Sequence, residues 1–186
     1  MYRAVKITFL ALTLSLASGC TLESYSDDNV LRISFAPASK DHWGWTAAVA
    51  MLFDYRHIHY SQSDIADFHE FYFGHNEISL DDISWLLWDL GGVDSIFDGT
   101  LSFREIQSHI DAGEPLLLNY SEYNSTYFGS HYDEYSGGHY AVLHGYDSTG
   151  HLYLHDPDYG TRLIHYDDLF YQTFHGQDHY WSSSLI

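Results

Sequence analysis

The chain has 186 residues and carries 26 Asp and Glu residues against 7 Lys and Arg residues, so its formal net charge is −19 at pH 7. Hydrophobic residues make up 45% of the chain, which is enough to bury the core of one domain and excludes wholesale disorder. The scarcity of basic residues excludes a protein that binds nucleic acid through its phosphates, or a membrane through cationic side chains.

The first 19 residues have the layout of an export signal. Arg3 and Lys6 supply positive charge, an apolar run follows over residues 7–17, and small residues precede Cys20. The apolar run is shorter than the roughly 20 residues that a membrane-spanning helix needs. We therefore predict that residues 1–19 are a signal peptide.

Cys20 is the only cysteine of the chain, which excludes an internal disulfide and a cysteine-rich zinc site. Residues 16–20 resemble a bacterial lipobox, in which the cysteine becomes the first mature residue and carries the lipid. An ordinary signal peptide with an incidental cysteine is the alternative. Residue 21, directly after the cysteine, is Thr, whereas an Asp at this position would resemble an inner-membrane retention signal. We therefore expect an exported lipoprotein on the outer membrane, facing the periplasm. Residues 20–36 would then be the lipidated cysteine and its tether, and residues 37–186 one domain.

The first half of this domain has the patterns of helices. Apolar residues recur at helical spacing over residues 43–57. Three further helix starts are predicted by capping boxes: Ser61 with Asp64, Ser79 with Asp82, and Ser102 with Glu105. Gly91-Gly92 and Gly113 are expected to end the last two of these helices.

The second half changes to the patterns of strands. Strands are predicted over residues 116–118, 139–146, 151–156, 162–166 and 180–185, with a hairpin turn at residues 147–150. Helices followed by antiparallel strands indicate an α+β fold.

The hairpin brings a histidine and a carboxylate together. If Asp147 and Gly150 flank the turn, His139 lies opposite Asp158, and Asp156 becomes a diagonal neighbour of His139 on the same face. A turn of three or five residues would break this parity. A histidine beside a carboxylate is the base-and-orienter part of a catalytic triad. An accidental pair among 14 histidines and 26 acidic residues is the alternative.

The same segments resemble a known family. A Gly-His pair at 138–139 is followed by an apolar strand, Gly-Tyr-Asp at 145–147 and a strand that ends in Asp-Pro at 156–157. These motifs resemble bacterial papain-like cysteine peptidases, in particular the bacteriocin-processing (double-glycine leader) peptidase-like group. Residues 43–48 resemble the start of the helix that carries the nucleophile in that family. The resemblance covers roughly residues 38–182 and implies a papain-like fold, with a helical first half packed on a C-terminal antiparallel sheet.

One departure from this family is decisive for function. The resemblance implies a nucleophilic cysteine at the position of Gly44 and an oxyanion-binding glutamine within residues 37–40, and this chain has neither. His139 and Asp156 would then be a remnant base and orienter. We expect a noncatalytic, lipid-anchored peptidase-like domain that binds a peptide or protein partner in the old active-site groove. The alternatives are an active hydrolase or transferase with an unrecognised nucleophile, such as Ser39 or Thr46, and a structural envelope lipoprotein.

A tyrosine-rich stretch over residues 121–138 suggests a recognition surface, because tyrosine gives large contact area at low entropic cost. We predict a binding rim of five aromatic residues: Trp43, Trp45, Tyr127, Tyr135 and Tyr140. A loop that merely packs on its own domain is the alternative. Histidines such as His57, His59, His155 and His165 invite a metal hypothesis, but no compact ligand motif is present, so we expect no metal and no cofactor.

Overall fold

The computed structural model describes residues 29–73, 78–122, 138–174 and 177–185. The helices of this part are α1 (Gly44–Tyr55), α2 (Gln62–Phe73), α3 (Leu80–Gly91) and α4 (Phe103–Ala112), with a short 3-10 turn at Tyr166–Asp168. The strands are β1 (Asn29–Val30), β2 (Phe97–Asp98), β3 (Leu116–Glu122), β4 (His139–Tyr146), β5 (His151–Asp156), β6 (Gly160–His165), β7 (Tyr171–Phe174) and β8 (Gln177–Leu185).

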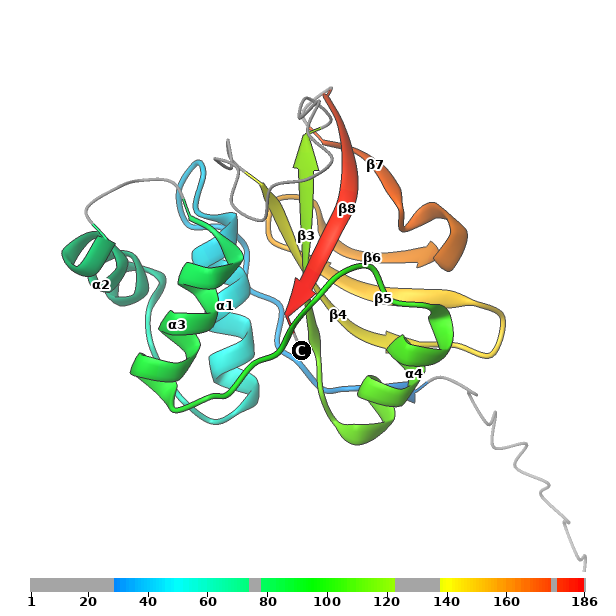
Figure 1. Cartoon of the computed structure of the whole chain (residues 1–186), viewed down its shortest axis with the longest axis horizontal. Coiled ribbons are helices and arrows are strands. Elements are labelled where there is room, and N and C mark those ends of the chain that lie inside the picture. Colours follow the sequence, from blue (N-terminus) through cyan, green and yellow to red (C-terminus); the bar gives the residue numbers. More distant parts are fainter. Residues whose placement is uncertain (1–28, 74–77, 123–137, 175–176, 186) are drawn as a thin grey trace, which may run out of the picture.

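The strands form one antiparallel sheet in the order β2-β8-β3-β4-β5-β6, with β1 paired to β4 and β7 paired to β8. Helices α1, α2 and α3 lie together on one side of this sheet, and α4 lies apart from them (Figure 1). The predicted α+β fold, with helices first and antiparallel strands second, is confirmed.

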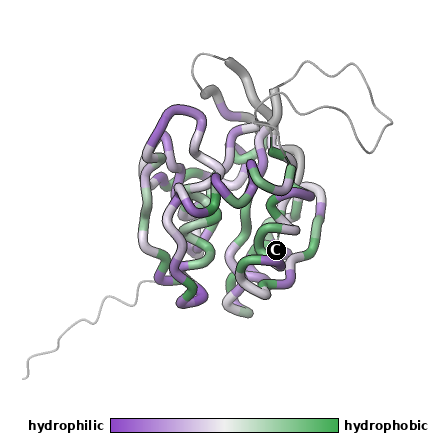
Figure 2. Tube along the Cα trace, turned by 90° about the vertical axis from the view of Figure 1, so that its left-hand side faces the viewer, coloured by the Kyte–Doolittle hydropathy of each residue, from purple (hydrophilic) through white to green (hydrophobic). Residues whose placement is uncertain are grey.

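Two hydrophobic cores lie on the two faces of the sheet, because successive strand residues point to opposite faces. Leu117 and Val142 pack with α1 and α3, whereas Leu116, Ala141 and Leu143 pack with α4. Figure 2 shows hydrophobic and hydrophilic residues interspersed along the whole trace. None of the helices in the described residues has the length and apolar character that crossing a bilayer requires.

Local sequence signals set the helix ends as predicted. The Ser79–Asp82 and Ser102–Glu105 pairs form complete capping boxes, and Ser61 and Asp64 exchange the equivalent bonds before α2. Helices α3 and α4 end in left-handed glycines, Gly92 and Gly113, with φ of 60° and 82°. A residue with a Cβ would be strained at either position.

The β4–β5 hairpin reaches the predicted register by a different route. Asp147 N donates to His151 O, so three residues rather than two make the loop, which shifts the register by one. A bulge between Leu143 and Gly145 shifts it back, and Val142 lies opposite His155. The turn prediction was wrong, but the two irregularities compensate, and the end of the hairpin that carries His139 and Asp156 keeps the predicted parity.

Candidate functional site

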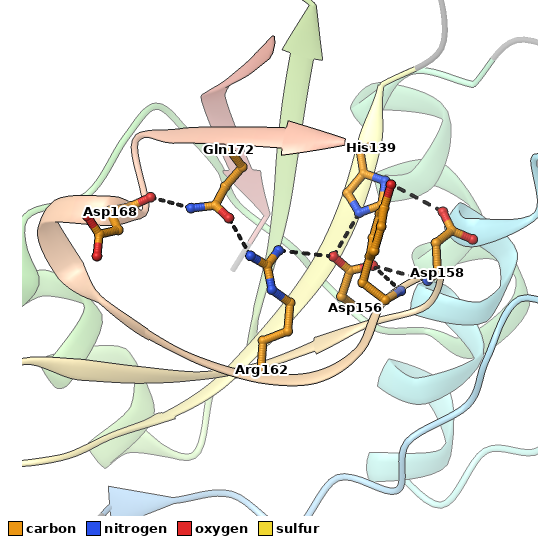
Figure 3. Close-up of polar contacts among 7 residues, drawn as sticks. His139, Asp156, Asp158, Arg162, Asp168 and Gln172 are labelled. Carbon is orange, nitrogen blue, oxygen red and sulfur yellow. Dashed lines mark hydrogen bonds and ion pairs between the residues drawn. The ribbon is translucent and has the colours of Figure 1, made fainter. Parts of the chain in front are cut away.

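The site is built at the ends of two neighbouring strands. His139 is the first residue of β4 and Asp156 the last residue of β5. His139 Nε2 lies 3.0 Å from Asp156 Oδ2, and both side chains are buried (Figure 3). The contact expected from the hairpin register is therefore present, and the role of the pair as a remnant base and orienter stays a prediction.

Both carboxylate oxygens of Asp156 have polar contacts besides His139. Its Oδ1 accepts hydrogen bonds from the backbone N–H groups of Asp158 and Tyr159, each 3.1 Å long. Its Oδ2 also lies 3.5 Å from Nη1 of Arg162 on β6. A buried carboxylate requires such compensation, because burial of an unpaired charge is costly. This arrangement fixes the carboxylate that orients the His139 ring.

Arg162 is itself positioned by a second layer of contacts. Its Nη2 donates to Gln172 Oε1 at 2.6 Å, and Gln172 Nε2 donates to the backbone carbonyl of Asp168 (Figure 3). No signal in the sequence pointed to Arg162 or Gln172, since their contact joins separate elements, β6 and β7.

A second carboxylate faces the other nitrogen of the histidine ring. Asp158 Oδ2 lies 3.5 Å from His139 Nδ1, and the Asp158 side chain is 28% exposed. Gly44, the first residue of α1, is close to the same oxygen, because a Cβ added there would lie 3.2 Å from Asp158 Oδ2. The predicted hairpin register places Asp158 opposite His139, but no role for Asp158 was predicted from the sequence.

Thr46, which sequence analysis considered as a replacement nucleophile, is unsuited to that role. It is fully buried, and its hydroxyl donates to the carbonyl of Trp43 at 2.8 Å. Ser39 is bound through its backbone, because Ser39 N donates to Gln62 Oε1 at 2.9 Å, while Gln62 Nε2 donates to Pro37 O at 2.8 Å. Gln62 therefore holds the segment before α1 in place.

The predicted binding rim is only partly present. Tyr140 is 3% exposed and its hydroxyl donates to Ile78 O, and Trp45 is 9% exposed and packs against His69. These two residues belong to the core, so their assignment to an exposed rim was wrong. Trp43 is half-buried, with the Lys40 ammonium 3.7 Å from its ring centroid.

Tyr127 and Tyr135 of the proposed rim, and Cys20 as the lipidation site, lie outside the described residues. The predicted boundaries of the signal peptide and tether, residues 1–19 and 20–36, likewise stay predictions.

Within the described residues, the group that has the spacing of a metal site is His139, Asp156 and Asp158, whose ligand atoms lie within 4.8 Å of one another. Asp156 is already engaged by Arg162 and two backbone N–H groups. A metal bound by His139 Nδ1 would therefore have Asp158 as its second protein ligand and Asp156 as the carboxylate behind the histidine. The four other histidines considered above are not part of this group.

The sequence of this chain was compared with models of known protein families and with curated proteins. A family model described as "Peptidase_C39 like family" matches residues 36–183. Among curated proteins, no sequence matches the chain.

Several solved structures share the fold. The peptidase domain of Streptococcus ComA, a bifunctional ABC transporter involved in quorum sensing, has 12% identity and a TM-score of 0.55, with 83% of this chain and 97% of that chain covered. A C39-like peptidase from Bacillus anthracis has 13% identity and a TM-score of 0.56, with 86% and 97% covered. A double-glycine motif protease from an AMS/PCAT transporter, in complex with its leader peptide, has 13% identity and a TM-score of 0.54, with 82% and 93% covered.

Proposed function

Because this chain belongs to the peptidase C39-like family, we propose that it is a noncatalytic, lipid-anchored member that binds a peptide or protein partner in the bacterial cell envelope. The observation that carries this proposal is that residue 44, which lies next to Asp158 and to the His139–Asp156 pair, is a glycine with no side chain. A relative with the same fold was solved in complex with a leader peptide, which supports a peptide as the ligand.

Gly44 would stand where the family has its nucleophilic cysteine. Glycine offers no nucleophile, and the only cysteine of the chain is Cys20. Cysteine peptidases act through a thiolate that is paired with a histidine. In this chain the carboxylate of Asp158 takes the place next to His139 Nδ1 that such a thiolate would use. His139 and Asp156 therefore keep the geometry of a base and its orienter, with no nucleophile to activate.

The proposal is tested with the purified full chain and a library of synthetic decapeptides. We expect binding without cleavage, measured by affinity selection and mass spectrometry. Replacement of Gly44 by Leu should weaken peptide binding at least about tenfold, because the new side chain would crowd the Asp158 carboxylate, whose Oδ2 lies 3.2 Å from the Cβ position. Gly99→Leu is the matched control, since a Cβ at Gly99 meets nothing within 4 Å.

Two results would overturn this proposal. Peptide turnover that disappears in His139→Ala would show an active hydrolase. A complete lack of peptide binding would favour a structural envelope lipoprotein. Urea unfolding of both glycine variants checks that any loss of binding reflects the site and not the fold.

The lipid anchor is a separate part of the proposal. When the chain is expressed in a bacterium with an outer membrane, we expect the wild type in the outer-membrane fraction with incorporated radiolabelled palmitate. Cys20→Ala should lose the label and leave that fraction, because acyl chains supply the membrane affinity of such an anchor. Ser18→Ala is the control and should keep both properties. Membrane association and palmitate incorporation that persist in Cys20→Ala would contradict an anchor at this cysteine.

A further inference from the structure

The two carboxylates at the site differ in how well they are compensated. Asp156 receives two backbone N–H groups, contacts Arg162 and is fully buried. Asp158 has His139 Nδ1 at 3.5 Å, which is longer than the 2.7–3.2 Å typical of an N–H···O bond. Its side chain is 28% exposed. Asp158 is therefore the carboxylate that a ligand can reach.

The surroundings of Asp158 favour a negative charge. Residue 44 has no side chain, and the Asp158 oxygen lies 3.2 Å from where a Cβ would stand. This position is at the N-terminus of α1, which has no side-chain cap and no acidic residue in its first turn. The N-terminal end of a helix carries partial positive charge and favours a nearby anion. Asp158, in the turn between β5 and β6, is such an anion.

Two aromatic rings, one near His139 and one at the start of α1, suit a cationic group. Tyr159 is 46% exposed, and its ring centroid is 5.8 Å from that of His139. At the same helix end, the Trp43 ring already carries the ammonium of Lys40 at 3.7 Å. Ammonium and guanidinium groups bind favourably over aromatic faces. A carbonyl oxygen or a carboxylate of a ligand would instead meet the Asp158 oxygen with no proton between them.

The charge of the whole chain acts in the same direction. It has 26 acidic against 7 basic residues. A field of this sign attracts cationic ligands and repels acidic ones before contact, and its effect weakens as salt increases.

We propose that this site selects basic peptides, and that Asp158 binds a cationic group of the peptide, a Lys or Arg side chain or a free α-amino group, beside Gly44. This inference rests on the proposed peptide-binding function and names the class of ligand. The Asp158 carboxylate, which lies next to His139 Nδ1 where a thiolate would lie in a cysteine peptidase, thereby binds a positive charge.

The experiment measures which residues the purified full chain enriches from a positional-scanning decapeptide library. Enrichment of Lys and Arg, or of free over acetylated N-termini, is expected for the wild type. Peptides selected in this way should bind Asp158→Asn at least about tenfold more weakly, as expected for loss of a hydrogen bond between charged groups. Asp89→Asn removes an equal charge from the exposed C-terminal part of α3 and should change the affinity less than about twofold.

The outcomes separate this inference from the function on which it rests. Peptide binding that is sensitive to Gly44→Leu but shows no basic preference, or an equal effect of the two Asp variants, would overturn the role of Asp158 and leave peptide binding intact. A complete absence of peptide binding would remove both. Calorimetric titration with zinc chloride alone is the third arm. Micromolar zinc binding that requires both His139 and Asp158, and that displaces the peptide, would show a metal site instead.

Discussion

Gly44→Cys alone is expected to give a thiol that is alkylated slowly, whereas Gly44→Cys combined with Asp158→Ala should be alkylated about one hundredfold faster at pH 7. The Cβ of residue 44 would lie 3.2 Å from Asp158 Oδ2. Two like charges about 4 Å apart repel by about 4 kcal/mol at the effective dielectric constant of a protein surface. The partial exposure of Asp158 reduces this repulsion, so we expect the carboxylate to raise the pKa of a thiol at residue 44 by about two units.

Removal of the Asp158 carboxylate should have a second effect on the same thiol. His139 Nδ1 then loses the Asp158 carboxylate as a neighbour and is expected to pair with the thiolate, while Asp156 still holds Nε2. Such a pair lowers the pKa of a cysteine. The measurement is the rate of iodoacetamide modification between pH 5 and pH 9, followed by mass spectrometry of the peptide that carries residue 44, so that Cys20 does not contribute.

The matched control is Gly44→Cys combined with Asp89→Ala, which should react as slowly as the single variant. Equal rates for Gly44→Cys and for the double variant with Asp158→Ala would show that Asp158 does not govern this position. The resemblance implies an oxyanion-binding glutamine within residues 37–40, and this chain has none there. We therefore expect the gain to be limited to thiol reactivity, because a peptidase also needs an oxyanion donor. We therefore expect weak peptide cleavage at most from the double variant.

The parts of the fold that were predictable are those set by contacts close in sequence. Ser79 and Asp82 bond to each other across one helical turn, so their spacing alone marks the start of α3. The bounds of β4 and β5 are also those predicted, because apolar runs flank a turn-forming segment. Strands β1 and β2 contain two residues each and carry no periodic pattern. Their pairing depends on chain segments that are distant in the sequence, so they were missed.

The site was predictable to the same extent. His139 and Asp156 lie on adjacent strands of one hairpin, so register alone brought them together. The proposed role of Asp158 depends on contact between the start of α1 and the turn after β5. These segments are distant in the sequence, and no local sequence pattern predicts their contact. Tyr140, in contrast, was predicted to be a site residue and is not one. An aromatic residue next to a tyrosine-rich stretch suggested a rim, but strand alternation directs this side chain into the core with α1 and α3.

The bulge in β4 creates a feature that sequence reasoning did not anticipate. His144 is the residue between the shifted registers, and its Nδ1 lies 3.1 Å from Leu31 O. The His155 ring stacks on it at 4.0 Å between centroids and bonds through Nε2 to Ile33 O at 2.9 Å. Two buried imidazoles therefore hold the segment that enters the domain. Ala38 N, further along this segment, donates to Pro157 O, the residue before Asp158.

Acid should weaken this attachment, because His144 resists protonation in the folded chain. Burial, and then the neighbouring His155, lower the pKa of His144 from 6.5 to about 4. The unfolded chain takes up this proton near pH 6.5 and the folded chain only near pH 4. The stability that neutral His144 contributes is therefore complete above pH 6.5 and is lost progressively as the pH falls to 4. At about 1.4 kcal/mol for each pKa unit, this loss amounts to about 3 kcal/mol.

His144→Phe should remove this pH dependence while keeping an aromatic ring against His155. Leu31 O stays bonded in the variant, because Ile33 N also donates to it at 3.0 Å. Urea unfolding at pH 7, 5.5 and 4 gives the free energy of unfolding of each form. Carboxylates titrate in both proteins, so the test is the difference between them, and the wild type should lose about 3 kcal/mol more than the variant between pH 7 and pH 4. His59→Gln, at a side chain that is 75% exposed, should follow the wild type. Parallel losses in wild type and His144→Phe would assign the acid sensitivity to other groups, since a neutral ring at position 144 has no proton to gain.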